Sequence, residues 1–395
     1  MRILICTQHR AVVGGVETYL RDLLPALALA GHSLALVCEC TDAAGDRAID
    51  AGVPGVPVSG VDAGMESFVR DFRPDVVYDQ GLLDSEAESW LSRSAPTLLY
   101  AHIHGGNCIS GTKRHSRPRE AVCERRFGLA CLLHYLPRGC GGSNPLTMLN
   151  LYRQQSRRRG LWPTFRGIAV AGRYMFDELR RNGVEERRLH RLPLFPSGIA
   201  PDPEALQRVP GGELLFLGRL TALKGAIHAV RALAILRASG AGDYRLTVVG
   251  DGAERGSLEA FARDNALPVT FVGSVDFPRR NEFLRSADLL VVPSVWGEPF
   301  GLVGIAAGCV GVPAAGFDAG GVADWLIPGE TGELAPADPP DPRGLADAIR
   351  RALADPVHYN ALRVGAWRLA REHSLALHVE RLETLLESCL EPEST

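Results

Sequence analysis

Two cations five residues apart follow an expected strand in the C-terminal half of the chain. Arg219 comes directly after Gly218, and Lys224 precedes Gly225 at the start of an expected helix. A guanidinium binds oxygen atoms through a planar fork, whereas an ammonium acts as a compact charge. Together they suit the two phosphates of a diphosphate. Lys224 and Lys113 are the only lysines among 43 basic residues, which favours a specific role for Lys224 over a solvated surface position.

A carboxylate stands just before another expected helix, in the segment Trp296-Gly297-Glu298-Pro299-Phe300-Gly301. The helix that should begin at Leu302 leaves backbone N–H groups unpaired in its first turn, and such groups favour an anion. Glu298 is an acceptor for the hydroxyl groups of a sugar. The surrounding stretch is too apolar to favour a merely solvated carboxylate.

Glycines mark three further turns at the ends of expected strands, namely Gly14-Gly15, Gly250-Asp251-Gly252 and Val272-Gly273. Glycine lets the backbone approach a ligand closely, and a helix that starts there adds affinity for an anion. Each turn also has an ordinary interpretation, as a tight turn or, for Asp251, as a helix cap. The G-x-G-x-x-G spacing of a dinucleotide fingerprint is absent.

Strands alternate with helices in both halves of the chain, which predicts an α/β fold with parallel βαβ units. The first half should have strands over 2–7, 34–38, 74–78, 97–101 and, as its last, 168–171, with helices ending near 30, 72 and 182. The second half should have strands over 213–218, 245–249, 269–272, 289–293 and 312–315. Its expected helices are 225–239, 253–265, 279–286, 302–309, 341–355, 357–372 and 375–390.

A proline-rich segment divides the chain into two such α/β units. We expect one domain over 1–197, a linker over 198–208, a second domain over 209–372 and a last helix within 373–395. Open α/β sheets bind ligands beyond the carboxyl ends of their strands, so two facing sheets place a binding cleft between the domains. The segment 105–162 interrupts the alternation. It is expected to be irregular, is rich in arginine and cysteine, and is too long for a plain connection.

In their order along the chain, these motifs resemble the family 4 retaining glycosyltransferases of the GT-B fold. The resemblance rests on Gly14-Gly15-Val16-Glu17, Gly218-Arg219 with Lys224-Gly225, Val249-Gly250-Asp251-Gly252, Phe271-Val272-Gly273, Glu298-Pro299-Phe300-Gly301-Leu302-Val303 and Gly320-Gly321-Val322-Ala323-Asp324. It covers essentially the whole chain and is strongest over 213–332. It implies two Rossmann-like, doubly wound domains facing across a cleft, the first on the acceptor side and the second holding a nucleotide sugar. The last helix would cross back to the N-terminal domain.

The resemblance also implies roles for individual residues. Arg219 and Lys224 would bind the diphosphate of the donor, and Glu298 would contact the transferred sugar. A histidine would lie near that sugar; His102 and His104 alternate on an extended segment, so at most one faces the cleft, and His104 is preferred. The remaining donor contacts would come from Gly14, Gly15, Gly250, Asp251, Gly252, Val272, Gly273, Phe300, Gly301, Leu302 and Ala306. Such enzymes need no metal for catalysis and retain anomeric configuration, with the leaving phosphate accepting the proton of the acceptor.

One position departs from the family pattern. The second glutamate of its E-x7-E motif, which holds the ribose hydroxyls, falls at Ala306. Losing a charged hydrogen bond costs roughly 1.5–3 kcal/mol, or about ten- to a hundredfold in affinity. A deoxyribose donor such as a dTDP-sugar, a compensating residue elsewhere, or weakened or altered function would each account for the alanine. The donor base therefore stays open among UDP-, GDP- and dTDP-linked sugars.

Four cysteines fall within the interrupting segment, namely Cys108, Cys123, Cys131 and Cys140. Four thiolates close a tetrahedral structural zinc site, although the spacing lacks a tight C-x2-C pair. Unlinked thiols are the alternative interpretation. A disulfide framework is not expected in a cytoplasmic protein.

The net charge of −3 conceals a basic segment. Residues 113–191 contain eighteen Lys/Arg and six Asp/Glu, which favours either an anionic acceptor, contact with a membrane surface, or a plain solvated helical surface. No run approaches the ~18–20 apolar residues that span a bilayer, and the first residues lack a signal-peptide pattern. We therefore expect a cytoplasmic protein, at the inner face of a membrane if the basic segment binds lipid. Nucleic acid is not an expected partner, because an aromatic stacking platform is missing.

The expected function is transfer of a sugar to a hydroxyl acceptor, which would be a glycan, a lipid-linked molecule or a natural product. Two alternatives stay open. A nucleotide-sugar epimerase shares the two-lobed fold and would turn over donor without an acceptor. A degenerate subunit that only binds nucleotide sugar is favoured by Ala306 and opposed by Glu298, Arg219 and Lys224.

Overall fold

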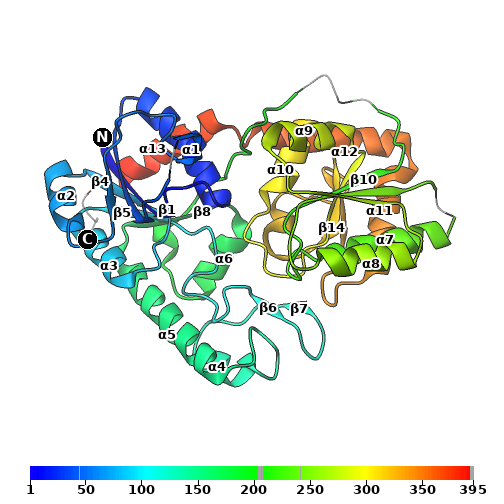
Figure 1. Ribbon diagram of the computed structural model, residues 1–395, viewed down its shortest axis with the longest axis horizontal. Helices are drawn as coiled ribbons and strands as arrows, with labels where there is room; N and C mark the ends of the chain where they lie inside the picture. Colours follow the sequence, from blue (N-terminus) through cyan, green and yellow to red (C-terminus); the bar gives the residue numbers. More distant parts are fainter. Residues whose placement is uncertain (44, 203–205, 207, 241, 392–395) are drawn as a thin grey trace.

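The computed structural model describes residues 1–43, 45–202, 206, 208–240 and 242–391. It has two lobes, each built on its own parallel β-sheet (Figure 1). The first sheet contains β1 (Arg2–His9), β2 (Ser33–Cys40), β3 (Val58–Gly60), β4 (Val76–Asp79), β5 (Thr97–Tyr100), β8 (Gly167–Val170) and β9 (Leu189–Arg191), in the order 3-2-1-4-5-8-9. The second contains β10 (Glu213–Leu217), β11 (Arg245–Val249), β12 (Val269–Gly273), β13 (Leu289–Val292), β14 (Ala314–Phe317) and β15 (Gly332–Ala335), in the order 12-11-10-13-14-15.

The strands at the centre of each sheet are continuous apolar runs because helices cover both faces. In β1, the side chains of Ile3 to Cys6 are fully buried, and Ile5 pairs with Leu36 of β2. The first sheet is covered by α1 (Gly15–Leu29), α2 (Met65–Phe72), α3 (Ser85–Ser94) and α6 (Arg173–Arg181). The second is covered by α7 (Ala226–Ala238), α8 (Arg255–Asp264), α9 (Phe277–Ser286), α10 (Leu302–Cys309), α11 (Pro342–Ala354) and α12 (Pro356–Arg371). The predicted α/β architecture of both halves is confirmed.

The last helix, α13 (Leu375–Ser388), returns to the N-terminal domain. Its buried side chains Val379, Leu382 and Leu386 join the core that α1 contributes to, and the two helices pack together. The crossing back of the chain is thus confirmed. Among the described residues, none of the helices is both long and apolar enough to span a bilayer.

Two histidines at this crossing hold the segment that follows β9. Nδ1 of His378 donates to the carbonyl of Pro193 at 2.8 Å, and Nδ1 of His373 donates to that of Leu194 at 2.9 Å. The hydroxyl of Tyr19 in α1 bonds Nε2 of His378 at 2.7 Å. The predicted linker, 198–208, lies partly outside the described residues.

The segment 105–162 was expected to be irregular, but it contains regular secondary structure. It forms a short hairpin of β6 (Arg114–His115) and β7 (Ala121–Val122), then α4 (Ala130–Tyr135) and the 17-residue α5 (Pro145–Leu161). Asn144 caps α5 by accepting from the N–H of Leu146 at 2.8 Å, and Pro145 stands in its first turn. The helix buries almost none of its length, so the sequence lacks the apolar stripe by which helices are found.

The expectation that 168–171 holds the last strand of the first half is also wrong. The strand β9 follows it and pairs in parallel with β8, through Ile168 and Leu189. β9, β3 and β15 were missed because they are three or four residues long and lie at sheet edges. Short edge strands carry little apolar periodicity.

Candidate functional site

Three of the predicted turns of the C-terminal domain pack against one another. Three backbone hydrogen bonds join them. The N–H of Gly218 donates to the carbonyl of Val249 at 3.0 Å, the N–H of Leu220 donates to the carbonyl of Asp251 at 2.9 Å, and the N–H of Gly250 donates to the carbonyl of Gly273 at 2.8 Å. At Gly250 the backbone has φ 131°, and a Cβ there would stand 1.9 Å from the carbonyl oxygen of Gly218. These glycines therefore allow close packing of the turns at the carboxyl edge of the sheet, where Arg219 is exposed.

Three hydrogen bonds anchor the carboxylate of Glu298. Its Oε2 accepts from Nζ of Lys224 at 2.7 Å, Nε1 of Trp296 at 2.9 Å and Oγ of Ser294 at 3.1 Å. The ammonium of Lys224 also lies 5.8 Å from the Trp296 ring centroid, within range of a cation–π interaction. Oε1 accepts no hydrogen bond from the described residues, so it is the oxygen left for a ligand hydroxyl. The two side chains that the sequence assigned separately form one ion pair. Ser294 and Trp296 were not predicted as part of the site.

The loop that carries Glu298 is fixed from behind. The N–H of Gly321 donates to the carbonyl of Glu298 at 2.6 Å, and Nε1 of Trp325 donates to that of Phe300 at 2.7 Å. Gly301 then adopts φ 88° directly before α10, whose start has no side-chain cap. The first N–H groups of α10 therefore form an uncapped helix N-terminus next to Glu298, which suits an anionic group.

A cavity of about 240 Å³ lies between the domains and collects residues from both. The N-terminal domain contributes Gly15, Thr18 and Tyr19 of α1, and the C-terminal domain contributes Leu302, Val303 and Ala306 of α10. Three predicted donor contacts, Gly15, Leu302 and Ala306, are thus brought together. The lining of the cavity is mostly apolar with a few polar side chains, as small-molecule sites usually are.

Arg280 of α9 lines the same cavity and was not predicted from the sequence. Its Nη2 donates to the carbonyl of Ser197 at 2.8 Å, and its guanidinium lies 4.4 Å from the centroid of the Phe277 ring. Burial lowers the pKa of Arg280, but a guanidinium stays charged in proteins. Only the fold reveals this residue, because no motif surrounds it.

His104 connects the two domains. Its Nε2 donates to the carbonyl of Gly297 at 2.6 Å, and its Nδ1 accepts from Nδ2 of Asn107 at 3.2 Å. Only 1% of the residue is exposed. Burial, helped by the charge of the nearby Lys113, lowers its pKa to about 4, although the bond to Gly297 and the charge of Glu298 oppose the shift. His104 is therefore neutral at physiological pH and holds the loop before Glu298.

His102 faces another part of the N-terminal domain. Its Nε2 donates to Oε1 of Gln80 at 2.8 Å, and its ring stacks on Tyr100 with centroids 4.3 Å apart. Burial lowers the pKa of His102 to about 3. The two histidines do diverge, and only His104 reaches the loop of Glu298.

The four cysteines of the segment 105–162 line one small cavity of about 20 Å³, together with His115 and His134. All four are free thiols. Sγ of Cys140 lies 3.5 Å from Nδ1 of His115, and burial raises the pKa of Cys140 to about 12. Across the described ranges of the chain, no group of three or more His, Cys, Asp or Glu side chains is placed to hold a metal ion. The zinc interpretation therefore has no support in this geometry.

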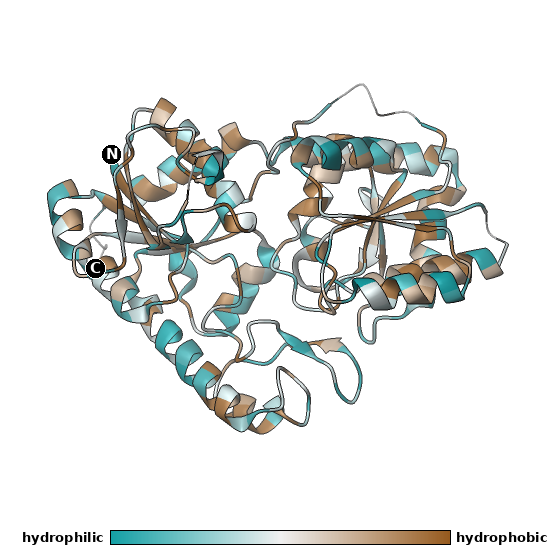
Figure 2. Ribbon diagram, in the orientation of Figure 1, coloured by the Kyte–Doolittle hydropathy of each residue, from teal (hydrophilic) through white to brown (hydrophobic). Residues whose placement is uncertain are grey.

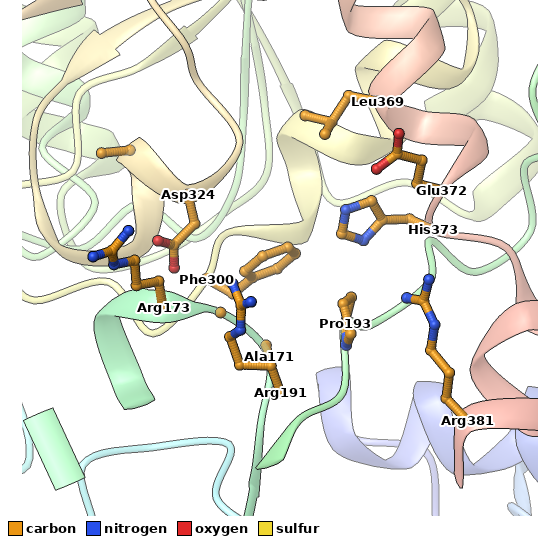
Figure 3. A pocket seen from close by; sticks show the side chains of 12 residues that line it. Ala171, Arg173, Arg191, Pro193, Phe300, Asp324, Leu369, Glu372, His373 and Arg381 are labelled. Carbon is orange, nitrogen blue, oxygen red and sulfur yellow. The ribbon is translucent and has the colours of Figure 1, made fainter. Parts of the chain in front are cut away.

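A second cavity between the domains, of about 530 Å³, is lined by Phe300 and by cations that include Arg191 and Arg381 (Figure 3). The rings of Phe300 and His373 lie side by side there, with centroids 5.6 Å apart. Asp324 accepts from the N–H of Tyr174 at 3.1 Å and so caps α6 from the opposite domain. Burial raises the pKa of Asp324 to about 6. This predicted motif residue thus joins the domains.

Comparison with known proteins agrees with this geometry. Residues 211–355 match the family model "Glycosyl transferases group 1". A glycogen synthase of Mycobacterium tuberculosis is 27% identical over 392 residues, covering 90% of this chain and 87% of the relative. A D-inositol 3-phosphate glycosyltransferase of Pseudarthrobacter chlorophenolicus is 28% identical over 368 residues, covering 87% and 83%.

Solved structures share the whole architecture. HepE of Anabaena in complex with UDP superposes with a TM-score of 0.70 at 16% identity, over 98% of this chain and 100% of that one. WaaG, a glycosyltransferase involved in lipopolysaccharide biosynthesis, superposes with a TM-score of 0.64 at 17% identity, over 97% and 99%. The chain therefore has the GT-B fold, and the comparisons taken together support a glycosyltransferase.

Proposed function

We propose that this chain is a retaining glycosyltransferase of family 4, which transfers a hexosyl group from a nucleoside-diphosphate sugar to a hydroxyl acceptor. The observation that carries the proposal is the Lys224–Glu298 ion pair, 2.7 Å long, beside the uncapped start of α10. A cation, a carboxylate and free helix N–H groups meet there at the edge of a cleft. These are the groups that a phosphate joined to a sugar requires.

The residues divide the work of binding. Arg219 and Lys224 offset the charge of the diphosphate, and the N–H groups at the start of α10 donate hydrogen bonds to its oxygens. Oε1 of Glu298 accepts from a hydroxyl of the sugar, while Oε2 stays bound to Lys224, Ser294 and Trp296. Gly15 of the N-terminal domain closes the site from the other side.

The same groups favour the transfer step. The bond between the anomeric carbon and the diphosphate oxygen breaks, and a bond from that carbon to the acceptor oxygen forms on the same face of the sugar. The proton of the acceptor hydroxyl passes to the leaving phosphate oxygen. Lys224 and Arg219 stabilise the negative charge that grows on the leaving group, which is the role in which fixed charges accelerate reactions most. No step requires a metal.

We further propose that Arg280 compensates for Ala306. Both residues line the 240 Å³ cavity. Nε and Nη2 of Arg280 donate to Asn281 and Ser197, whereas Nη1 has no hydrogen-bond partner among the described residues and is left for the ribose that the family's second glutamate would otherwise bind. A guanidinium donates to hydroxyl oxygens, whereas a carboxylate accepts from them. This exchange retains a charged hydrogen bond to a ribonucleotide such as UDP. HepE was solved with UDP and UDP-glucose, which is consistent with a UDP-linked donor.

The proposal is tested by assaying glycosyl transfer with UDP-glucose and a panel of hydroxyl acceptors. We expect UDP release that depends on the acceptor, and a product whose anomeric proton shows the same configuration as the donor. Lys224→Met should lose about ten- to a hundredfold in kcat/KM through one charged interaction. Arg263→Gln, at an exposed arginine of α8, is the matched control and should keep full activity.

Other outcomes would overturn it. An inverted product would exclude the retaining mechanism. Conversion of the donor without any acceptor would identify an epimerase instead. Tight donor binding with no turnover across the whole panel would favour a subunit that only binds nucleotide sugar.

A further inference from the structure

The end of the arm formed by α4 and α5 exposes large apolar side chains. Leu129, Leu133 and Leu146 are 74%, 77% and 70% exposed, and Leu136 and Leu149 are 38% and 39% exposed. We call these five leucines the α4–α5 tip. Figure 2 shows apolar residues gathered at this end of the molecule, while α5 becomes hydrophilic toward the body of the domain. Isolated exposed leucines are ordinary, but five on two adjacent elements form a patch.

The leucines of the tip face outward because the opposite faces of both helices are used for packing. On α4, Leu129, Leu133 and Leu136 share one face, while Cys131, Leu132 and Tyr135 join the small core of the arm.

On α5, Leu146 and Leu149 lie on one stripe with Arg153 and Arg157. The other face of α5 supplies Met148, Leu151 and Tyr152 to the same core. The outer stripe of α5 therefore begins apolar at the end of the arm and becomes cationic toward the domain.

The charge around the tip has one sign. Residues 125–176 contain nine arginines and no aspartate or glutamate. Arg125, Arg126, Arg153 and Arg157 are exposed, and none of them forms an ion pair within the described part of the chain. These cations are therefore available to an external partner.

Two neighbouring arginines serve the fold instead. Arg158 pairs with Glu88 at 3.3 Å, and Arg159 donates to the carbonyls of Phe127 and Asn182 at 2.8 Å each. One face of α5 therefore stabilises the fold, whereas the arginines of its outward face form no ion pair within the described part of the chain.

We propose that the α4–α5 tip docks on the surface of a lipid bilayer that contains anionic lipids. The leucines enter the boundary between headgroups and acyl chains, and the arginines bind the phosphate groups around them. An apolar patch bordered by cations on an outward helix face is the composition that such a surface selects. The arm projects from the N-terminal domain on the side away from α9 and α13, where the body of the molecule leaves it accessible (Figure 1).

Charge argues against the other occupants of such a patch. A second copy of the chain would bring two acid-free, arginine-rich stretches together, and like charges would oppose the contact. A nucleic acid would match the arginines, but the leucines offer no aromatic ring on which its bases could stack. The docking of the tip goes beyond glycosyl transfer and does not depend on it.

The test is co-sedimentation of the full chain with vesicles of phosphatidylcholine, with and without phosphatidylglycerol. The protein should sediment only with the anionic vesicles and should be released by high salt, because exposed charges are screened. Leu129→Gln with Leu133→Gln should weaken the partition coefficient by about tenfold or more. Arg153→Gln with Arg157→Gln should weaken it by about 25-fold, since each cation near an anionic surface contributes about fivefold.

The control variants change equally exposed residues elsewhere. Leu29→Gln alters the last residue of α1, which is 90% exposed, and Arg263→Gln alters α8. Both should bind vesicles as the wild type does. All variants should melt at the wild-type temperature, because none of these side chains is buried.

Equal binding to neutral and anionic vesicles, or none to either, would overturn the proposal. So would equal losses in the tip variants and their controls. Light scattering that shows a dimer dispersed by the leucine variant, without vesicle binding, would assign the tip to a second copy of the chain.

Discussion

At the scale of single residues, the proposed site depends on the ion pair between Lys224 and Glu298. Lys224 and Glu298 form an ion pair at 2.7 Å, which compensates the charge of the nearly buried carboxylate and involves only one of its two oxygens. Breaking such a pair by removing one partner leaves the other uncompensated. Both residues were recognisable in the sequence, because each follows a strand and precedes a helix.

Arg280 gives the first prediction at this scale. Arg280→Gln should weaken the binding of UDP by about ten- to a hundredfold, because a charged hydrogen bond to the ribose is lost. Isothermal titration with UDP and dTDP measures the effect. Arg279→Gln changes the exposed neighbour on α9 and serves as the control. If Arg280→Gln left UDP affinity unchanged, or if the wild type bound dTDP more tightly than UDP, Arg280 would not compensate for Ala306.

His104 gives the second prediction at this scale. Its pKa of about 4 lies below the ordinary 6.5, so between these values the unfolded chain binds a proton that the native chain excludes. The stabilisation is complete above pH 6.5 and is lost as the pH falls toward 4. The loss amounts to roughly 2 kcal/mol at pH 5. His104→Gln keeps a donor for the carbonyl of Gly297 and removes the titration. Between pH 7 and pH 5, the unfolding free energy of His104→Gln should therefore drop by roughly 2 kcal/mol less than that of the wild type.

Chemical denaturation of both proteins at the two pH values checks this. An equal drop in the wild type and in His104→Gln would show that His104 does not titrate on unfolding.

At the scale of elements, the position of Glu298 depends on the short helical turn over Gly320–Asp324 that follows β14. Gly320 has φ 63°, and a Cβ there would stand 2.5 Å from the backbone nitrogen of Glu298. The loop and the turn therefore contact backbone to backbone. This contact explains why a glycine pair far from Glu298 in sequence belongs to the same site.

Gly320→Ala should displace the loop of Glu298. We expect at least about a tenfold loss of kcat/KM and a loss of roughly 1–3 kcal/mol of stability, from backbone strain and overpacking. Gly256→Ala is the matched control: it lies in α8 with nothing within 4 Å of the added Cβ, so it should be neutral or stabilising by up to about 1 kcal/mol. Thermal melting and steady-state kinetics measure both. If Gly320→Ala melted and turned over like the wild type, the backbone contact would not matter.

The elements also show how far sequence patterns reach. The buried strands and amphipathic helices were predictable, because apolar periodicity and glycine turns mark them directly. α5 was not, since its residues are mostly exposed and its stability comes from Asn144, Pro145 and a few contacts on one face. β9 was missed because three residues at a sheet edge carry no periodic signal. Within the site, Arg219, Lys224 and Glu298 were predictable from local motifs. Arg280 was not, because only the folded chain brings residues of α9, α1 and α10 together around one cavity.

At the scale of the whole molecule, contacts between the domains converge on the loop before Glu298. His104 and the carbonyl of Thr112, both from the N-terminal domain, bond Gly297 at 2.6 Å and 3.3 Å. Asp324 reaches in the opposite direction to cap α6. The same loop thus belongs to the proposed ligand site and to the domain interface, so ligand binding and the relative position of the domains are expected to influence each other.

The most direct test of the central claim is the binding of nucleoside diphosphates to the cleft, measured as thermal stabilisation by UDP, GDP, ADP and dTDP. We predict a clear rise in melting temperature with one of them, foremost UDP, that increases with concentration as expected for a ligand of the native state. Lys224→Met should abolish most of this rise, and Arg263→Gln should retain it. An unchanged melting temperature with all four nucleotides, or an equal rise in Lys224→Met, would contradict the claim that this cleft holds a nucleotide-sugar donor.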